Sequence, residues 1–101
     1  MPVIQVFAQQ FADVPTKLEA VCRAVADELG LRPVDVVATF VAVTETVVPG
    51  QRSPSWPVVV VHGSARRPEQ MRQACDRIRA LAASWSAGSD GDAWVTWQLP
   101  G

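Results

Sequence analysis

The sequence carries one pattern twice, and this repeat restricts the fold more than any other feature. Residues 2–47 and residues 57–99 each start with proline and an apolar run, continue with an amphipathic helical pattern, and end in a β-rich segment. Such internal similarity indicates a duplicated supersecondary unit. The 101 residues suffice for one modest core and not for two. We therefore predict a single domain over residues 1–101, built from two consecutive βαβ units.

The first unit can be delimited from its cap and turn residues. Val3–Ala8 is predicted as a strand, and residues 13–30 as a helix that tolerates Pro15 in its first turn and ends at glycine. Many β-branched residues predict a long second strand over residues 36–47. The helix has one apolar stripe, which consists of Leu18, Val21, Cys22, Val25 and Leu29.

The second unit has the same order of elements. Residues 57–62 predict a strand, residues 68–85 a helix, and residues 93–99 a closing strand. Cys22 in the first helix and Cys75 in the second occupy equivalent apolar positions. We expect both to be buried thiols, rather than disulfide partners or metal ligands.

The fold class follows from the crossover helices. A helix that connects two neighbouring strands of one sheet makes those strands parallel. The expected fold is α/β (α+β), with a four-stranded mixed sheet and two helices on one face. Residues 36–43 and 58–61 are apolar at both alternating sets of positions, which is typical of strands buried on both faces. Because two helices cover only one face, we predict that another copy of the chain covers the second face in an obligate homo-oligomer.

Composition and charge exclude several classes of function. Nine Lys and Arg against ten Asp and Glu give a formal net charge of −1, without the basic field that nucleic-acid binding requires. The longest apolar run is far shorter than the roughly 20 residues of a membrane-spanning helix, and the N-terminus lacks the basic start of a signal peptide. We expect a cytoplasmic protein with no nucleic-acid or membrane partner.

The start of the chain and its helix spacing resemble a known family. The opening Met-Pro-Val-Ile-Gln-Val, a helix about ten residues later, and a second strand after Gly30-Leu-Arg-Pro-Val-Asp35-Val resemble 4-oxalocrotonate tautomerase (4-OT) and its relatives. The doubled βαβ pattern resembles the longer branch of this tautomerase superfamily, which includes macrophage migration inhibitory factor (MIF), cis-3-chloroacrylic acid dehalogenase and malonate semialdehyde decarboxylase. This resemblance implies a homotrimer whose sheets face inward, and a catalytic proline exposed by removal of Met1.

Two segments of the second unit resemble the region where these enzymes bind substrate. Val60-Val61-His62-Gly63-Ser64-Ala65-Arg66 resembles the dehalogenase segment that carries a carboxylate-binding arginine. Arg66-Arg67-Pro68-Glu69-Gln70 resembles the arginine-to-helix junction of the short tautomerases. Both resemblances select Arg66. Asp35 stands where the decarboxylase carries a functional aspartate.

The sequence departs from the family at positions that matter for catalysis. Ala12 and Ala38 stand where the short tautomerases have catalytic arginines, and Thr96 stands where the dehalogenase has a tyrosine. The whole chain contains no tyrosine. These departures indicate that the substrate differs from those of the characterised members.

Pro2 supplies the predicted chemistry once Met1 is removed. A free α-amine has a pKa of about 8, and burial beside cations lowers it toward neutrality, so that the amine takes and returns a proton. Arg66 and Arg67 precede a helix whose N-terminus is already partly positive, a placement that favours a bound anion. A guanidinium holds a carboxylate through two parallel hydrogen bonds. We therefore predict Pro2 as general base and acid, and Arg66 and Arg67 as substrate-binding residues.

Four further residues are candidates for accessory roles: Asp35 as a water-activating acid, His62 as a proton shuttle, Arg52 as a second carboxylate contact and Trp97 as a pocket wall. Each also has a structural interpretation. A short acidic residue before a strand is commonly a turn-former, an arginine in a proline-rich loop is commonly solvated, and a tryptophan in a strand is commonly part of the core.

The leading hypothesis is an isomerase that transfers a proton on a small keto- or enol-carboxylate, without a metal or organic cofactor. Hydration, dehalogenation and decarboxylation stay open as reactions of the same residues. Two other classes stay open as well. One is a catalytically silent tautomerase-like oligomer, and the other is a ferredoxin-like small-ligand-binding or regulatory domain, because that fold has the same order of elements.

Overall fold

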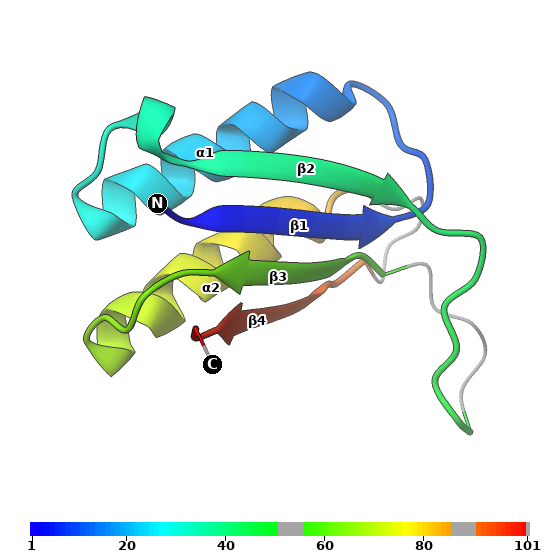
Figure 1. Ribbon diagram of the computed structural model, residues 1–101. Helices are drawn as coiled ribbons and strands as arrows, with labels where there is room; N and C mark the ends of the chain where they lie inside the picture. The colour runs from blue at the N-terminus through cyan, green and yellow to red at the C-terminus, as the bar shows by residue number, and fades with distance from the viewer. Residues whose placement is uncertain (51–55, 86–90, 101) are drawn as a thin grey trace.

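The computed structural model describes residues 1–50, 56–85 and 91–100. Its elements follow the order β1 (Val3–Ala8), α1 (Val14–Leu29), β2 (Val37–Ala42), β3 (Val58–His62), α2 (Pro68–Ala82) and β4 (Trp94–Gln98). A short 3₁₀ helix, η1 (Pro33–Asp35), precedes β2. Figure 1 shows the four strands as one sheet with both helices behind it.

The strand order across the sheet is β2-β1-β3-β4. β1 pairs in parallel with β2, β3 pairs in parallel with β4, and the two central strands β1 and β3 are antiparallel. This arrangement confirms the predicted mixed sheet with two helices on one face. It is not ferredoxin-like, because in a split βαβ arrangement a third strand separates the two parallel strands, whereas β1 and β2 are direct neighbours.

Of the two residues expected to bound α1, Gly30 acts as a cap and Asp13 does not, because Asp13 is in the left-handed conformation, with φ 57°, and its side chain makes no cap hydrogen bond. Asp13 precedes the first helical residue, and Pro15 lies in the first turn, where its missing N–H removes no helical hydrogen bond. Gly30 ends the helix in the left-handed conformation, with φ 69°, and its N–H donates to the carbonyl of Ala26. A residue with a side chain would be strained at that φ.

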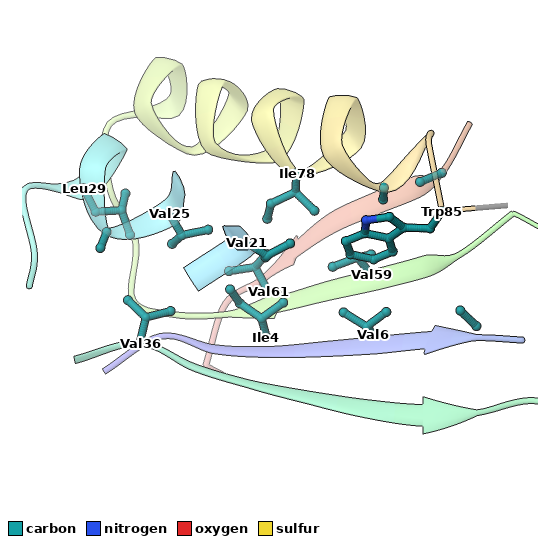
Figure 2. Packing of buried hydrophobic residues seen from close by; sticks show 14 residues of the cluster. Ile4, Val6, Val21, Val25, Leu29, Val36, Val59, Val61, Ile78 and Trp85 are labelled. Carbon is teal, nitrogen blue, oxygen red and sulfur yellow. The ribbon is translucent and has the colours of Figure 1, made fainter. Parts of the chain in front are cut away.

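The core lies between the helices and one face of the sheet. Ile4 and Val6 of β1 and Val59 and Val61 of β3 are fully buried there, at alternating positions of the two central strands. Figure 2 shows Ile78 of α2 pointing down onto these strands. Among the described residues, no polar or charged residue is fully buried.

The opposite face of the sheet, which we call the open face, is turned toward the viewer in Figure 1 and no described segment covers it. It consists of the alternate residues of all four strands: Val37, Thr39 and Val41; Val3, Gln5 and Phe7; Val58, Val60 and His62; Trp94, Thr96 and Gln98. Apolar side chains outnumber charged ones on it, and Val37 and Val41 are each 41% exposed.

Two arginines of α2 tie the helices and the sheet together. Arg77 pairs with Asp27 of α1 at 2.7 Å and with Glu28 at 3.3 Å. Arg79 holds Asp92, just before β4, through two hydrogen bonds of 2.7 Å. These bonds, together with the N–H of Ala93, lower the pKa of Asp92 to about 2. The Arg77 pairs thus join α2 to α1, and the Arg79 pair joins α2 to the start of β4.

The structure corrects several expected boundaries. β2 ends at Ala42 rather than at residue 47, because β1 ends at Ala8 and the bond from Val43 N–H to the Ala8 carbonyl is the last between them. The face of β2 away from the helices is exposed in a single chain, and it is the face that the sequence predicts another copy to cover. α2 ends at Ala82 rather than at residue 85. β3 begins at Val58 rather than at residue 57, and β4 spans Trp94–Gln98 rather than residues 93–99.

The two cysteines are free thiols, as expected, but each is half-buried rather than fully buried. Desolvation raises the pKa of both Cys22 and Cys75, with smaller contributions from Glu19 and Asp76 respectively. Their neutral thiols therefore act as small apolar side chains at the margin of the core.

Replacing Ile78 with alanine tests the core. Because Ile78 is fully buried, its truncation should lower the free energy of unfolding by about 2–5 kcal/mol through lost apolar burial and a residual cavity. Val34→Ala, at a site that is 75% exposed, should change it by no more than about 0.5 kcal/mol. Urea unfolding followed by circular dichroism measures both values, and equal effects of the two substitutions would contradict this core.

Candidate active site

The pairing of the strands brings three chain segments together at one edge of the sheet. Val3, the first residue of β1, lies between Val37, the first residue of β2, and His62, the last residue of β3. Figure 1 shows the N-terminus at this edge, beside the start of β2 and the arrowhead of β3. The candidate residues Pro2, Asp35 and His62 therefore share one edge, and the segment to Arg66 leaves from it.

Pro2 lies at the start of the central strand β1 and is buried. Its carbonyl accepts a hydrogen bond of 3.1 Å from the N–H of Val37. Proline lacks an N–H to donate, and the first position of a strand is one of the few in a sheet that tolerates this loss. Met1, in contrast, is 79% exposed.

Asp35 is the last residue of η1. Arg32 donates to its two carboxylate oxygens at 3.1 Å and 3.2 Å. These hydrogen bonds are the main cause of the lowered pKa of Asp35, and the positive charges of Arg32 and of the N-terminal amine lower it further. The carboxylate therefore lies within electrostatic reach of the N-terminus, with Arg32 already bound to it.

His62 lies on the open face, partly buried, at the end of β3. Its Nε2 is 2.7 Å from Oε1 of Gln5 on β1. With the Gln5 oxygen as acceptor, the N–H at Nε2 donates, and Nδ1 remains for a second partner. The neighbouring strand thus holds the orientation of the ring.

Arg66 and Arg67 lie where β3 leads into α2. Arg67 is exposed and stands directly before the first helical residue, and its carbonyl accepts from Gln70 and Met71. Arg66 is half-buried. Within residues 1–50, 56–85 and 91–100, neither guanidinium has an ion-pair partner. Two unpaired guanidinium groups beside a helix N-terminus make this junction electropositive.

Trp97 reaches the same junction from β4. It is partly buried against the core on the helix-covered face, and its Nε1–H donates to the carbonyl of Gly63 at 3.1 Å. It does not share the open face with His62. Arg52 lies outside the described residues, so the structure does not place it.

Sequence reasoning missed three residues that build this edge. Gln5 orients His62, Arg32 binds Asp35, and Gly63 receives the indole of Trp97. Arg32 and Asp35 stand three residues apart on either side of a proline, and this spacing could have predicted their ion pair. The other two contacts join residues that are far apart in the chain and that no local pattern pairs.

Three clefts of the chain lie away from Pro2. The first, about 580 Å³, lies between α1 and α2. The second, about 420 Å³, lies between α1 and the start of β2, and the third, about 230 Å³, lies beside Trp56 and Trp94. Neither Pro2 nor Arg66 lines any of the three. These three clefts are therefore not formed by the two main candidate residues.

Across the parts of the chain that the structure describes, no three His, Cys, Asp or Glu side chains gather in a way that could hold a metal ion. In those same parts, neither helix is long and apolar enough to cross a membrane.

No protein-family model matches the sequence, and no curated protein matches it. Solved structures match it over nearly its whole length. A wild-type fused 4-OT described as a symmetric trimer has a TM-score of 0.80 at 17% identity, over 97% of this chain and 85% of that chain. Leishmania major MIF2 has a TM-score of 0.80 at 19% identity, over 99% of this chain and 89% of that chain. The chain has the tautomerase fold.

A third solved structure with this fold is Pt0534 inactivated by 2-oxo-3-pentynoate. Its TM-score is 0.77 at 16% identity, over 97% of this chain and 83% of that chain. At such identities the likeness establishes the tautomerase fold, and function has to be argued from the residues of this chain.

Replacing Arg32 with alanine tests the carboxylate at this edge. The pKa of Asp35 should rise toward its ordinary value of about 3.9, because the variant lacks the hydrogen bonds that stabilise the carboxylate. In the parent, Asp35 therefore stays ionised to lower pH than in the variant. A ¹³C NMR titration of the carboxyl carbon measures this difference.

Arg23→Ala is the matched control, because Arg23 pairs with Glu19 within α1 and should leave the titration of Asp35 unchanged. Identical Asp35 titration curves for the parent and for Arg32→Ala would contradict the pair.

Proposed function

We propose that the mature chain begins at Pro2 and that it is an isomerase, which catalyses keto-enol tautomerisation of a small carboxylate. The observation that carries this proposal is the position of Pro2, buried at the start of a central strand, while Met1 before it is 79% exposed. Removal of an exposed methionine turns the nitrogen of Pro2 from an amide into a secondary amine, and only the amine is basic.

The neutral amine is the proposed base. Burial of Pro2 disfavours the protonated form of the amine, and the nearby Asp35 carboxylate is already paired with Arg32, so the proposed pKa of the amine lies below the ordinary value of about 8. It removes a proton from the carbon next to the substrate carbonyl, and the protonated amine returns that proton at another position. No metal or organic cofactor takes part in these steps.

Arg66 is the proposed carboxylate anchor. It is half-buried and without an ion-pair partner among the described residues, at a junction that the helix N-terminus of α2 makes more positive. Its planar guanidinium fixes the substrate carboxylate through two hydrogen bonds and stabilises the negative charge of the enolate. Arg67, exposed next to it, is proposed as a second contact for the same carboxylate.

The accessory residues support tautomerisation more than water-dependent reactions. Both carboxylate oxygens of Asp35 already accept hydrogen bonds from Arg32, which leaves this group poorly disposed to activate water for hydration or hydrolytic dehalogenation. His62, held by Gln5, has one ring nitrogen free to relay a proton.

We further propose a cytoplasmic location.

The open face supports a homotrimer. Phe7, Val58 and Val60 lie on it, and apolar strand surface of this kind is normally buried. We propose that three copies bury these faces against one another, as the symmetric trimer of the structurally similar fused 4-OT makes plausible. A neighbouring copy would then lie beside the site edge.

One specific observation favours a second candidate function, a catalytically silent oligomer of the same fold. Ala12 and Ala38 stand where the short tautomerases have catalytic arginines, and the chain has no tyrosine. The experiment below separates the two candidates.

Three substitutions test the enzyme. With a simple enol acid followed by ultraviolet absorbance, Pro2→Ala should lower kcat/KM by about 100-fold, because the secondary amine is lost. Arg66→Ala should raise KM by about 10- to 100-fold, because a charge-assisted contact is lost. Arg72→Ala is the matched control: Arg72 is on α2, 68% exposed and 3.8 Å from Glu69, and its loss should leave both constants unchanged.

Labelling with 2-oxo-3-pentynoate supplies an independent readout. The Pro2 nitrogen adds to the triple bond and its proton moves to carbon, so the protein mass rises by that of the whole reagent. Peptide mapping should locate the adduct on Pro2 in a chain that lacks Met1. Equal rates for Pro2→Ala and the parent would refute the role of the Pro2 amine. A chain that keeps Met1 and tautomerises no enol acid would exclude the enzyme and favour the silent oligomer.

Sedimentation velocity tests the trimer. The parent at micromolar concentration should sediment with three times the 10.9 kDa mass of one chain. Phe7→Glu places a charge on the open face and should shift the protein to monomers, because an unpaired charge cannot be buried between apolar strands. Val34→Glu, at a 75% exposed site off the sheet, should keep the trimer. A stable parent monomer would refute the assembly.

A further inference from the structure

The contact between Trp97 and Gly63 is unusually close. The indole Nε1–H of Trp97 donates to the carbonyl of Gly63 at 3.1 Å. A Cβ atom on Gly63 would come within 2.9 Å of Cζ2 of the same ring, so the ring lies directly against a backbone that only glycine allows. The N–H of Gly63 donates to the carbonyl of Gln98 at 3.2 Å. Both polar groups of Gly63 are thus bound to β4.

Gly63 is one of two fixed points that bracket Arg66. The other is Arg67, whose carbonyl accepts the first hydrogen bonds of α2 from Gln70 and Met71. Between these points the chain has only three residues, of which Ser64 and Ala65 are exposed. Neither of them is packed tightly enough to hold the segment, so the anchored ends set the path of the backbone that carries Arg66.

We infer that Trp97 is a positioning residue for Arg66 and acts through Gly63. This inference rests on the proposed function, in which Arg66 binds the substrate carboxylate. Two parallel hydrogen bonds to a carboxylate require the guanidinium in one place and one orientation, and a displacement of about 1 Å strongly weakens such a contact. The hydrogen bond from the indole keeps Gly63, and with it the start of the Arg66 segment, in register with β4.

A role in packing alone makes a different prediction. If Trp97 only filled space beside the core, phenylalanine would be a fair replacement, because it keeps an aromatic ring and removes the N–H. If Trp97 positions Arg66, the lost hydrogen bond to Gly63 weakens carboxylate binding while Pro2 keeps its chemistry. A positioning role therefore changes the binding constant of the reaction and leaves its rate constant unchanged, whereas a packing role leaves both constants unchanged.

The experiment measures inactivation of the full-length protein by 2-oxo-3-pentynoate as a function of reagent concentration. The half-saturation constant KI reports binding of the keto acid, and the limiting rate kinact reports attack by the Pro2 amine. Trp97→Phe should raise KI by about three- to tenfold, the effect of one hydrogen bond, and leave kinact unchanged. Gly63→Ala, which forces Cβ against the ring, should raise KI in the same way.

The double variant Trp97→Phe with Arg66→Ala decides whether Trp97 acts through Arg66. Its KI should equal that of Arg66→Ala alone, because a contact already removed cannot be weakened further. Trp85→Phe is the matched control: Trp85 follows α2 and stacks on Phe11 at 4.9 Å, away from the segment that carries Arg66, and should leave KI unchanged. Circular dichroism of each variant confirms that the fold is retained.

An unchanged KI in folded Trp97→Phe, or KI effects of Trp97→Phe and Arg66→Ala that multiply, would overturn this inference and leave the proposed function standing. A parent that is not labelled at Pro2, or a KI that Arg66→Ala does not change, would overturn the proposed function and the inference with it. If Trp97→Phe fails to fold, Gly63→Ala in the parent and in Arg66→Ala gives the same comparison.

Discussion

The antiparallel pairing of β1 with β3 is the constraint on which the candidate site depends. It joins the two βαβ units, and it sets the first residue of β1 beside the last residue of β3. Because β2 runs parallel to β1, its start and η1 arrive at the same edge. The backbone pairing of the strands therefore places Pro2, Asp35 and His62 at one edge of the sheet. With another strand order, these three residues would lie at different edges of the sheet.

Much of this fold can be read from the sequence because its signals are local. Proline and glycine mark the ends of α1, and the apolar stripes of both helices predict which faces are buried. The length of β2 could not be predicted in the same way. Its sequence stays rich in β-branched residues past Ala42, but a strand lasts only as long as its partner, and β1 ends at Ala8. Pairing between distant segments, not propensity, sets that boundary.

For the candidate site as well, local sequence signals predict some features and contacts between distant segments determine the others. The resemblance of short motifs pointed to Pro2 and Arg66, and the structure brings the start of β1 and the segment leading to Arg66 to one edge. What orients these groups was not visible in the sequence, since the contacts of His62 with Gln5 and of Trp97 with Gly63 span the two units. The chemical roles of all these residues are proposals that follow from position and charge.

The protonation of one nitrogen tests the account most directly. The mature protein, labelled with ¹⁵N-proline, can be titrated by NMR while its intact mass is checked for loss of Met1. We predict one proline nitrogen that titrates as an amine, with a pKa clearly below the ordinary value of about 8. A chain that retains Met1 has no such nitrogen, and either that result or a pKa at or above 8 would contradict the account.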